Sequence, residues 1–163
     1  MDIILKKITM DDWQDYKTIR LEGLRNESTA FASSYEEEKE FSEEIMKERS
    51  KSAILAYSDS KPIGLLVYLI NSRMKTRHVA NIYSVYVNKN YRGLGVGKKL
   101  IKKALALIKQ DKKVIKVNLG VNPEQISALK LYESFGFKIV GLYQKEVLIG
   151  NKFYDTAFME LFF

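Results

Sequence analysis

The chain of 163 residues contains one short stretch, Arg92-Gly93-Leu94-Gly95-Val96-Gly97, that places three glycines within five positions. An apolar run typical of a strand precedes it, and an amphipathic run typical of a helix follows it. Glycines let a backbone approach a phosphate closely, and a helix N-terminus offers N–H groups and the positive end of its dipole. The stretch therefore predicts a site for a phosphate-bearing ligand. A tight strand-to-helix turn without a ligand is the alternative.

The spacing excludes two other phosphate motifs. A P-loop, G-x-x-x-x-G-K-[ST], would need glycine at Arg92 and a hydroxyl residue at Lys99. A dinucleotide-binding fingerprint needs G-x-G-x-x-G with an acidic residue about 20 positions later. Here the spacing is G-x-G-x-G, and no acidic residue fits.

A second motif begins at Asn122 and continues with Ala128, Leu129, Leu131-Tyr132-Glu133 and Phe135-Gly136-Phe137. The two motifs together resemble the R/Q-x-x-G-x-G/A and N…A…LYE…GF signatures of the GCN5-related N-acetyltransferase (GNAT) superfamily. Val85-Tyr86-Val87-Asn88 is similar to the fourth strand of that superfamily, which leads into the loop. The resemblance covers residues 79–140 closely and the flanks more loosely.

This resemblance implies acetyl-coenzyme A as the acyl donor, and no metal is expected. Backbone amides of the Arg92–Lys98 segment would bind the pyrophosphate, and a bulged fourth strand would free N–H groups near Tyr86 and Val87. The pantetheine arm would add to the open sheet edge there. The implied binding residues are Tyr86, Val87, Arg92, Gly93, Leu94, Gly95, Val96, Gly97, Lys98 and Asn122.

The net charge of +7 is concentrated near the loop, in Lys98, Lys99, Lys102, Lys103, Lys109, Lys112, Lys113 and Lys116. These lysines could form a nucleic-acid face, hold the remaining phosphates of a small ligand, or solvate a helix. The acidic residues cluster elsewhere, within residues 36–44, which favours a local anion site. A nucleic-acid module would also need a groove-reading motif or interleaved aromatic and basic residues, so no nucleic-acid partner is expected.

Acetyl transfer to an amine needs a neutral amine, a polarised thioester carbonyl and a donor for the leaving thiolate. The chain has no cysteine, which excludes an acetyl-cysteine intermediate and favours direct attack in a ternary complex. The resemblance implies Tyr132 as the acid, since a phenol is protonated at neutral pH. Packing within an amphipathic helix is the alternative role for Tyr132.

The general base is less clearly marked. Many members of the superfamily carry an acidic residue on the fourth strand, where this chain has Asn81, Tyr83 and Ser84. Glu22 on the first helix is a candidate catalytic base, and a water molecule relayed by Tyr83 or Ser84 is an equal alternative. His78, the only histidine, is expected to be structural or exposed.

The acceptor is expected to be a primary amine of a small molecule or a protein. In the superfamily, the first two helices and the last hairpin shape the acceptor groove. Aromatic side chains there could surround an aliphatic amine, and an arginine could hold a carboxylate. The candidates are Arg20, Glu22, Arg25, Asn26, Phe31, Tyr35, Tyr143 and Tyr154.

Hydrophobic periodicity predicts a fold of the α/β class (α+β type), with a mixed sheet of about seven strands and about four helices on its two faces. The resemblance implies that the sheet is mostly antiparallel. A helix from Trp13 would be capped by Asp11 or Asp12, a second would span Tyr35–Arg49, and another would have Pro123 in its first turn. This last helix would end at Phe135-Gly136, a C-terminal glycine signal. Turns that connect two successive strands are expected at residues 58–62 and at Gly150-Asn151. The expected strands are 3–8, 53–57, 63–70, 79–87, 114–119, 137–149 and 152–161.

Composition is that of one globular domain over residues 1–163, with 46% hydrophobic and 29% charged residues. No signal peptide and no apolar run of about 20 residues is visible, so a cytoplasmic location and no membrane partner are expected. A non-catalytic acyl-CoA-binding protein of the same fold is the alternative function. The sequence leaves open whether the protein forms a homodimer.

Overall fold

The computed structural model describes residues 2–163 and contains a seven-stranded sheet whose hydrogen-bonded neighbours follow the order β1-β2-β3-β4-β5-β7-β6. β4 and β5 are parallel, whereas the pairs β1–β2, β2–β3, β5–β7 and β7–β6 are antiparallel. The sheet is therefore mixed, as the sequence predicts. The strands are β1 (Ile4–Lys7), β2 (Ala53–Ser58), β3 (Lys61–Ile70), β4 (Val79–Val87), β5 (Lys116–Val121), β6 (Lys138–Ile149) and β7 (Lys152–Phe162).

Five α-helices accompany the sheet in the described residues, together with three single turns of 3₁₀ helix. The helices are α1 (Trp13–Asn26), α2 (Tyr35–Glu38), α3 (Glu43–Ser50), α4 (Val96–Ile108) and α5 (Ile126–Ser134). The 3₁₀ turns are η1 (Met10–Asp12), η2 (Ser28–Ala30) and η3 (Lys89–Tyr91).

The single helix predicted over Tyr35–Arg49 is wrong, because the structure has α2 and α3 in its place. Ser34 caps α2 in a capping box with Glu37, and the hydroxyl of Ser42 accepts from the N–H of Ile45 to start a new helix. A serine side chain can hydrogen-bond to nearby backbone N–H groups, which favours the start of a new helix over continuation of the previous one. The number of helices is five for this reason, rather than about four.

Two other local predictions need correction. Asp12 lies at the N-cap of α1 but makes no side-chain cap bond to that helix. The capping box surrounds η1 instead: the Thr9 hydroxyl accepts from the N–H of Asp11, and the Asp12 carboxylate accepts from the N–H of Thr9. Pro123 lies in a turn before α5, which starts at Ile126. In that turn the N–H of Glu124 donates to Asn122 Oδ1 over 2.9 Å.

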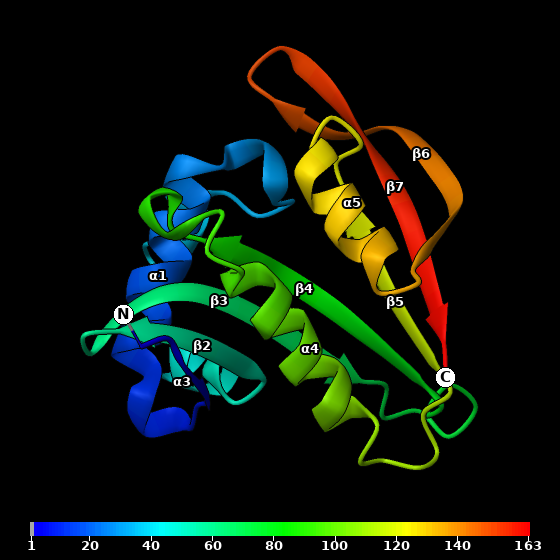
Figure 1. Ribbon diagram of the computed structural model, residues 1–163. Helices are drawn as coiled ribbons and strands as arrows, with labels where there is room; N and C mark the ends of the chain where they lie inside the picture. Colours follow the sequence, from blue (N-terminus) through cyan, green and yellow to red (C-terminus); the bar gives the residue numbers. More distant parts are fainter. Residues whose placement is uncertain (1) are drawn as a thin grey trace. The chain divides into compact units, whose positions relative to one another are not determined.

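The chain forms two compact units. The first contains residues up to Tyr68 together with Ser84–Leu107, and the second contains Leu69–Tyr83 together with Ile108–Phe163. Figure 1 labels their elements. Each unit has its own buried residues.

In the first unit, β2 and β3 are buried on both faces. Ala53, Leu55, Leu65 and Val67 join a core with residues of α1 and α3, including Ile19 and Met46. The opposite face meets α4, since a Cβ at Gly64 would lie 3.2 Å from the Leu100 side chain. Figure 1 shows this arrangement, with α3 and α4 on different sides of the two strands. The α4 residues that this packing buries are Val96, Leu100, Ile101, Ala104 and Leu105.

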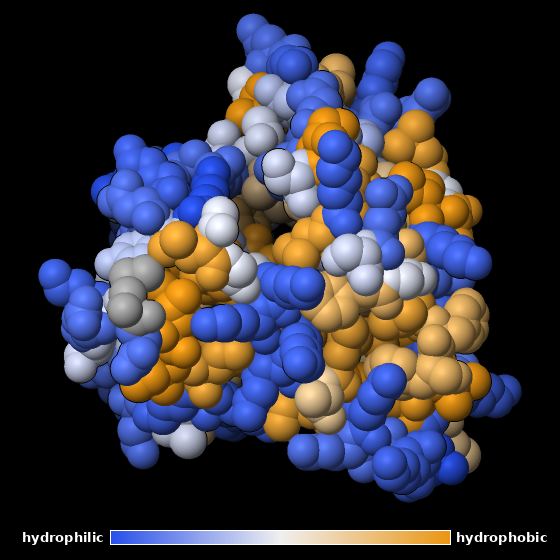
Figure 2. Space-filling model, in the orientation of Figure 1, coloured by the Kyte–Doolittle hydropathy of each residue, from blue (hydrophilic) through white to orange (hydrophobic). Residues whose placement is uncertain are grey.

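In the second unit, α5 ends at Ser134, and Gly136 follows two positions later with a φ of 93° that suits glycine. The N–H of Gly136 donates to Glu133 O over 2.9 Å, and the N–H of Phe137 donates to Tyr132 O over 3.2 Å. These two bonds form a Schellman motif, which confirms the predicted glycine stop. The last strand pair exposes many apolar side chains, visible in orange over the labelled β6 and β7 when Figures 1 and 2 are compared. They include Ile139, Val140, Leu142, Tyr143, Leu148 and Phe153.

Candidate active site

The glycine loop runs from Arg92 to Gly95 and leads directly into α4. Gly93 and Gly95 have φ angles of 76° and 77°, and no atom lies within 4 Å of a Cβ built on either residue. The first helical bond of α4 runs from the Lys99 N–H to Gly95 O over 3.0 Å. The N–H groups in the first turn of a helix have no helical carbonyl before them, so they are available to an anion. An open, left-handed loop at a helix start fits a diphosphate.

The side chain of Arg92 fixes the base of this loop. Its Nε donates to the carbonyl of Val87 over 3.0 Å, and its Nη2 forms an ion pair with Glu27 after α1. Two of the three guanidinium nitrogens thus bind the protein itself. The superfamily resemblance implies that Arg92 contributes to a ligand through its backbone.

Tyr86 lies beneath α1 and is nearly fully buried. Its hydroxyl donates to Glu22 Oε1 over 2.8 Å, and its ring lies so close to Gly23 that a Cβ there would be 3.0 Å from it. Burial, followed by the hydrogen bond to Glu22, raises the pKa of Tyr86 to about 12. The phenol therefore keeps its proton and acts as a donor at neutral pH. The ring of Tyr86 leaves no room for a side chain at position 23, and the sequence motifs did not reveal this need for Gly23.

Glu22 accepts a second hydrogen bond, from Asn88 Nδ2 over 2.7 Å. Asn88 in turn accepts from the N–H of Asn90 and donates its own N–H to the carbonyl of Ile63. Glu22 thus connects α1 with the end of β4 and the start of the loop. This contact joins residues more than 60 positions apart, and no local pattern in the sequence signals it.

β4 is irregular at Ser84. This residue has a φ of 57° within the strand, and the parallel pairing of β4 with β5 ends at Ile82↔Leu119. A residue in the left-handed region inside a strand is typical of a bulge. The irregularity lies two positions before Tyr86, in the segment where the resemblance implies a bulge.

The second unit carries the two remaining residues of the predicted site. Asn122 is buried at the end of β5 and supports the turn before α5. Tyr132 is buried on α5, and its ring meets that of Phe137 edge-to-face with centroids 6.1 Å apart. Burial raises the pKa of Tyr132 above its usual range, so the phenol keeps its proton at neutral pH.

A hollow of about 210 Å³ opens in the second unit over β4, β5, β6 and β7. Strand register aligns Asn81 with Asn118, and Asn118 with Glu160, in one row across three strands. Asn118 Oδ1 is buried and has no hydrogen-bond partner among the described residues, and Glu160 pairs with Lys116. Alternation along a strand indicates only the face on which a residue lies, so no local pattern in the sequence signals this row. The lining residues are Asn81, Tyr83, Asn118, Leu119, Gly120, Val140, Phe158, Met159 and Glu160.

Several residues proposed for the acceptor groove have partners of their own. The Arg20 guanidinium lies 5.0 Å from the ring centre of Phe31, and that of Arg25 lies 4.4 Å from the ring centre of Tyr35. The ring of the exposed Tyr143 contacts that of Phe158, a lining residue of the hollow, with centroids 4.5 Å apart and planes tilted by 56°. His78 is exposed, and its backbone carbonyl accepts from the N–H groups of residues 115 and 116.

The surroundings of the loop carry the expected charge. Lys98, Lys99 and Lys102 are exposed along α4. In residues 2–163, no group of three or more His, Asp or Glu side chains is placed to hold a metal ion. No helix in the same range is long and apolar enough to cross a membrane.

Comparison with known proteins adds to this geometry. A curated relative, an uncharacterized N-acetyltransferase of Methanocaldococcus jannaschii, is 26% identical over 148 residues, which are 90% of this chain and 63% of the relative. The L-amino acid N-acetyltransferase of Escherichia coli K12 is 24% identical over 106 residues, or 65% of each chain. The chain therefore spans less than two thirds of the length of these curated relatives.

A solved structure has the same fold. The phosphinothricin acetyltransferase of Sinorhizobium meliloti, in complex with acetyl-CoA, matches with a TM-score of 0.80 at 20% identity, over 99% of this chain and 88% of that chain. The sequence model described as the acetyltransferase (GNAT) family matches residues 11–137. The matched range contains the glycine loop and the second motif up to Phe137. The chain therefore belongs to the acetyltransferase (GNAT) family.

Proposed function

We propose that this protein is an acetyl-CoA-dependent N-acetyltransferase that moves an acetyl group directly to a primary amine in a ternary complex. One observation carries the proposal: in a chain of this family, Gly93 and Gly95 hold left-handed conformations beside open space at the start of α4. The names of the relatives, each called an N-acetyltransferase, support the same reaction.

In this proposal, the backbone amides of Arg92–Lys98 bind the pyrophosphate, and Asn122 contributes from the second motif. The N–H groups near Tyr86 and Val87 polarise the thioester carbonyl. Exposed lysines of α4 such as Lys98 meet the remaining phosphates. Acetyl-CoA supplies the acetyl group, and the reaction forms one C–N bond while it breaks one C–S bond.

Tyr132 is the proposed donor to the departing sulfur. A thiol has a pKa near 8.5, whereas burial raises that of Tyr132 above its usual 10. The phenol therefore holds its proton more tightly than a thiol does, and its contribution is a hydrogen bond that stabilises the developing thiolate.

The base that takes the amine proton is proposed to be Glu22, with a water molecule relayed by Tyr83 or Ser84 as the alternative. Glu22 Oε1 accepts hydrogen bonds from Tyr86 and Asn88, which fixes the orientation of the carboxylate. The chain has no cysteine, which supports direct transfer rather than a covalent acetyl-enzyme.

We propose the hollow of the second unit as a subsite for the amine. Its polar groups include the partnerless acceptor Asn118 Oδ1 and the carboxylate of Glu160, and its aromatic wall includes Tyr83 and Phe158. An ammonium group suits this chemistry, because it only donates hydrogen bonds and is attracted to ring faces.

The proposal includes a cytoplasmic location, which the absence of cysteine supports. It also leaves room for a homodimer, because β6 is an edge strand with apolar side chains at its surface. A size-exclusion measurement of molar mass tests the homodimer. No nucleic-acid partner is proposed.

The first experiment is continuous detection of free CoA thiol with acetyl-CoA and a panel of polyamines, amino acids, aminoglycosides and N-terminal peptides. The protein contributes no thiol background, because it has no cysteine. Thiol release that depends on one amine would establish the reaction and its acceptor. If every amine is inert while acetyl-CoA still raises the melting temperature, either the acceptor lies outside the panel or the protein is the acyl-CoA-binding alternative.

A further inference from the structure

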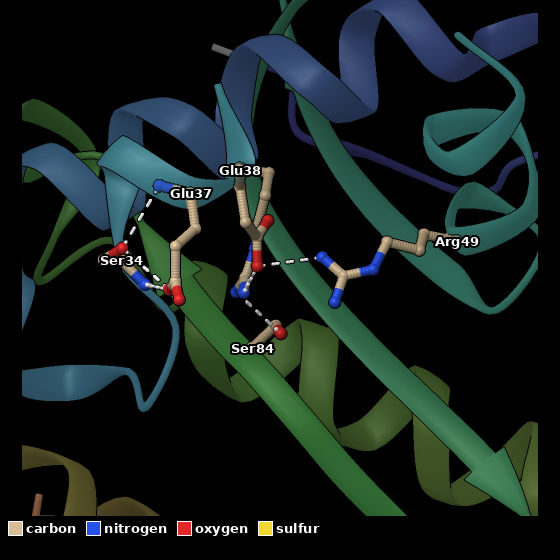
Figure 3. Close-up of polar contacts among 6 residues, drawn as sticks. Ser34, Glu37, Glu38, Arg49 and Ser84 are labelled. Carbon is tan, nitrogen blue, oxygen red and sulfur yellow. Dashed lines mark hydrogen bonds and ion pairs between the residues drawn. The ribbon is translucent and has the colours of Figure 1, made fainter. Parts of the chain in front are cut away.

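A buried charge network joins α1, α2 and α3 in the first unit. Arg20 donates from Nε and Nη2 to the two carboxylate oxygens of Glu38, over 2.9 and 2.6 Å. Arg49 lies on the same carboxylate at 2.8 Å, as Figure 3 shows. Glu38 is 1% exposed and Arg20 is 5% exposed. Two guanidinium groups thus share one carboxylate, which leaves a net positive charge in and beside the interior.

Stability alone does not explain such a network. Removing these charged groups from water is costly, and well-packed apolar residues would often serve as well or better. The Arg20–Glu38 bond is bidentate, however, and a bidentate pair fixes the direction of the guanidinium plane. The third nitrogen of Arg20 is therefore held in one orientation.

That third nitrogen, Nη1, donates to the hydroxyl of Ser84 over 2.9 Å. Ser84 is the residue of β4 with a φ of 57°. Left-handed backbone is unfavourable for an L-residue other than glycine, and it persists only where the surroundings hold it. The bond from Arg20 is a contact that can hold it. Figure 3 shows Ser84 beneath Glu38, joined by a dashed line to the side chain between them.

We propose that Arg20 is a positioning residue for acetyl-CoA binding. Glu38 clamps the guanidinium, the guanidinium holds Ser84 in its left-handed conformation, and this conformation sets the direction of the N–H groups at Tyr86 and Val87. The inference rests on the proposed function, because those N–H groups matter only if acetyl-CoA binds along β4.

The test measures acetyl-CoA affinity by titration calorimetry for the wild type, Ser84→Ala and Ser84→Gly. Alanine loses the hydroxyl and keeps the backbone penalty, so β4 relaxes and affinity falls about tenfold or more. Glycine also loses the hydroxyl but adopts a positive φ without strain, so Ser84→Gly retains most of the affinity. If the serine only stabilised the fold, Ser84→Ala and Ser84→Gly proteins with equal melting temperatures would bind acetyl-CoA with equal affinity.

Arg20→Lys tests the clamp itself. Lysine has a single ammonium group in place of the planar guanidinium with its several donors. It can therefore pair with Glu38 but cannot also direct a donor at Ser84. Arg20→Lys is expected to match Ser84→Ala in affinity, and the double variant is expected to be no weaker than either single variant. The exposed Arg73→Lys serves as the control and keeps wild-type affinity.

Two results would overturn the inference in distinguishable ways. Wild-type protein that does not bind acetyl-CoA removes the proposed function and this inference together. Wild-type protein that binds acetyl-CoA, with Ser84→Ala or Arg20→Lys binding equally well, removes the positioning role and leaves the proposed function intact.

Discussion

The hydroxyl of Tyr86 donates to Glu22 Oε1 over 2.8 Å and so ties β4 to α1 directly before the glycine loop. The contact gives Glu22 two tasks that can be separated by experiment. A carboxylate can accept the bonds from Tyr86 and Asn88, and it can also remove a proton from an amine. An amide can do only the first of these.

Glu22→Gln is therefore expected to keep acetyl-CoA affinity and to lower kcat by about 10²-fold, since the amide oxygen still accepts both hydrogen bonds but is not a base. Calorimetry gives the affinity, and thiol release gives kcat. Glu22→Ala is the matched comparison and should lose affinity as well, because Tyr86 and Asn88 lose their acceptor. Wild-type turnover in Glu22→Gln would assign the base to a relayed water.

Gly95→Val is expected to abolish measurable acetyl-CoA binding. Valine strains a backbone with a φ of 77°, and its branched side chain would crowd the path of the phosphates. Gly141→Val is the control, because Gly141 also faces open space but does not have a positive φ. Calorimetry that finds unchanged affinity in Gly95→Val would contradict the assigned role of the loop.

Tyr132→Phe is expected to lower kcat by about 10²-fold at unchanged acetyl-CoA affinity, because it removes only the donor to the thiolate. Tyr16→Phe, at another buried tyrosine, should keep wild-type kcat. Because burial raises the pKa of Tyr132, its ionisation should not limit kcat up to about pH 10. Normal turnover in Tyr132→Phe would leave packing against Phe137 as the role of this ring.

The stability contributed by Glu38 should depend on pH in a defined window. Burial alone would raise the pKa of Glu38, but the hydrogen bonds from Arg20 and the ion pair with Arg49 outweigh it and lower the pKa from 4.5 to about 2. A depressed pKa means that the contribution is complete above pH 4.5 and is lost as the pH falls toward 2. Urea unfolding should show Glu38→Gln less stable than the wild type by roughly 3–5 kcal/mol at pH 7, with a smaller difference at pH 3.

Glu43→Gln is the control for this measurement. Glu43 pairs with Lys47 on the exposed side of α3, and such pairs contribute only about 0–1 kcal/mol. A difference between wild type and Glu38→Gln that stays constant from pH 7 to pH 3 would contradict the network described here.

Asn118→Leu is expected to leave stability unchanged or slightly higher, because it removes a buried acceptor that has no partner. The same change should raise the KM for the amine about tenfold, with acetyl-CoA affinity unchanged, if Asn118 contacts the acceptor. Thiol release at varied amine concentration measures this. An unchanged KM would remove the hollow from the acceptor subsite.

Local signals in the sequence predicted several elements correctly. The glycine loop leads into α4, Gly136 follows the end of α5, and two-residue turns connect β2 with β3 and β6 with β7. In each case the conformation depends on a residue and its immediate neighbours. Such features can be read from the chain without knowledge of its tertiary contacts.

Features that depend on distant contacts could not be predicted. Glu38 belongs to the acidic cluster of residues 36–44, yet it is buried and pairs with Arg20, which lies 18 residues earlier. Glu22 accepts a hydrogen bond from Tyr86, which lies 64 positions later in the sequence. The register that aligns Asn81, Asn118 and Glu160 likewise follows from strand order rather than from any local pattern.

The turn between β2 and β3 has a practical value. Asp59 and Ser60 both have positive φ angles, 50° and 63°, the pattern of a hairpin turn that favours Asn-Gly. Replacing this pair with Asn-Gly would put glycine at position 60 and so remove the left-handed strain of Ser60, which costs about 1 kcal/mol, while Asn tolerates a positive φ at position 59 as Asp does. The exchange would therefore give a more stable version of the protein. Variants that are too unstable in the natural background could then be purified and assayed in the stabilised one.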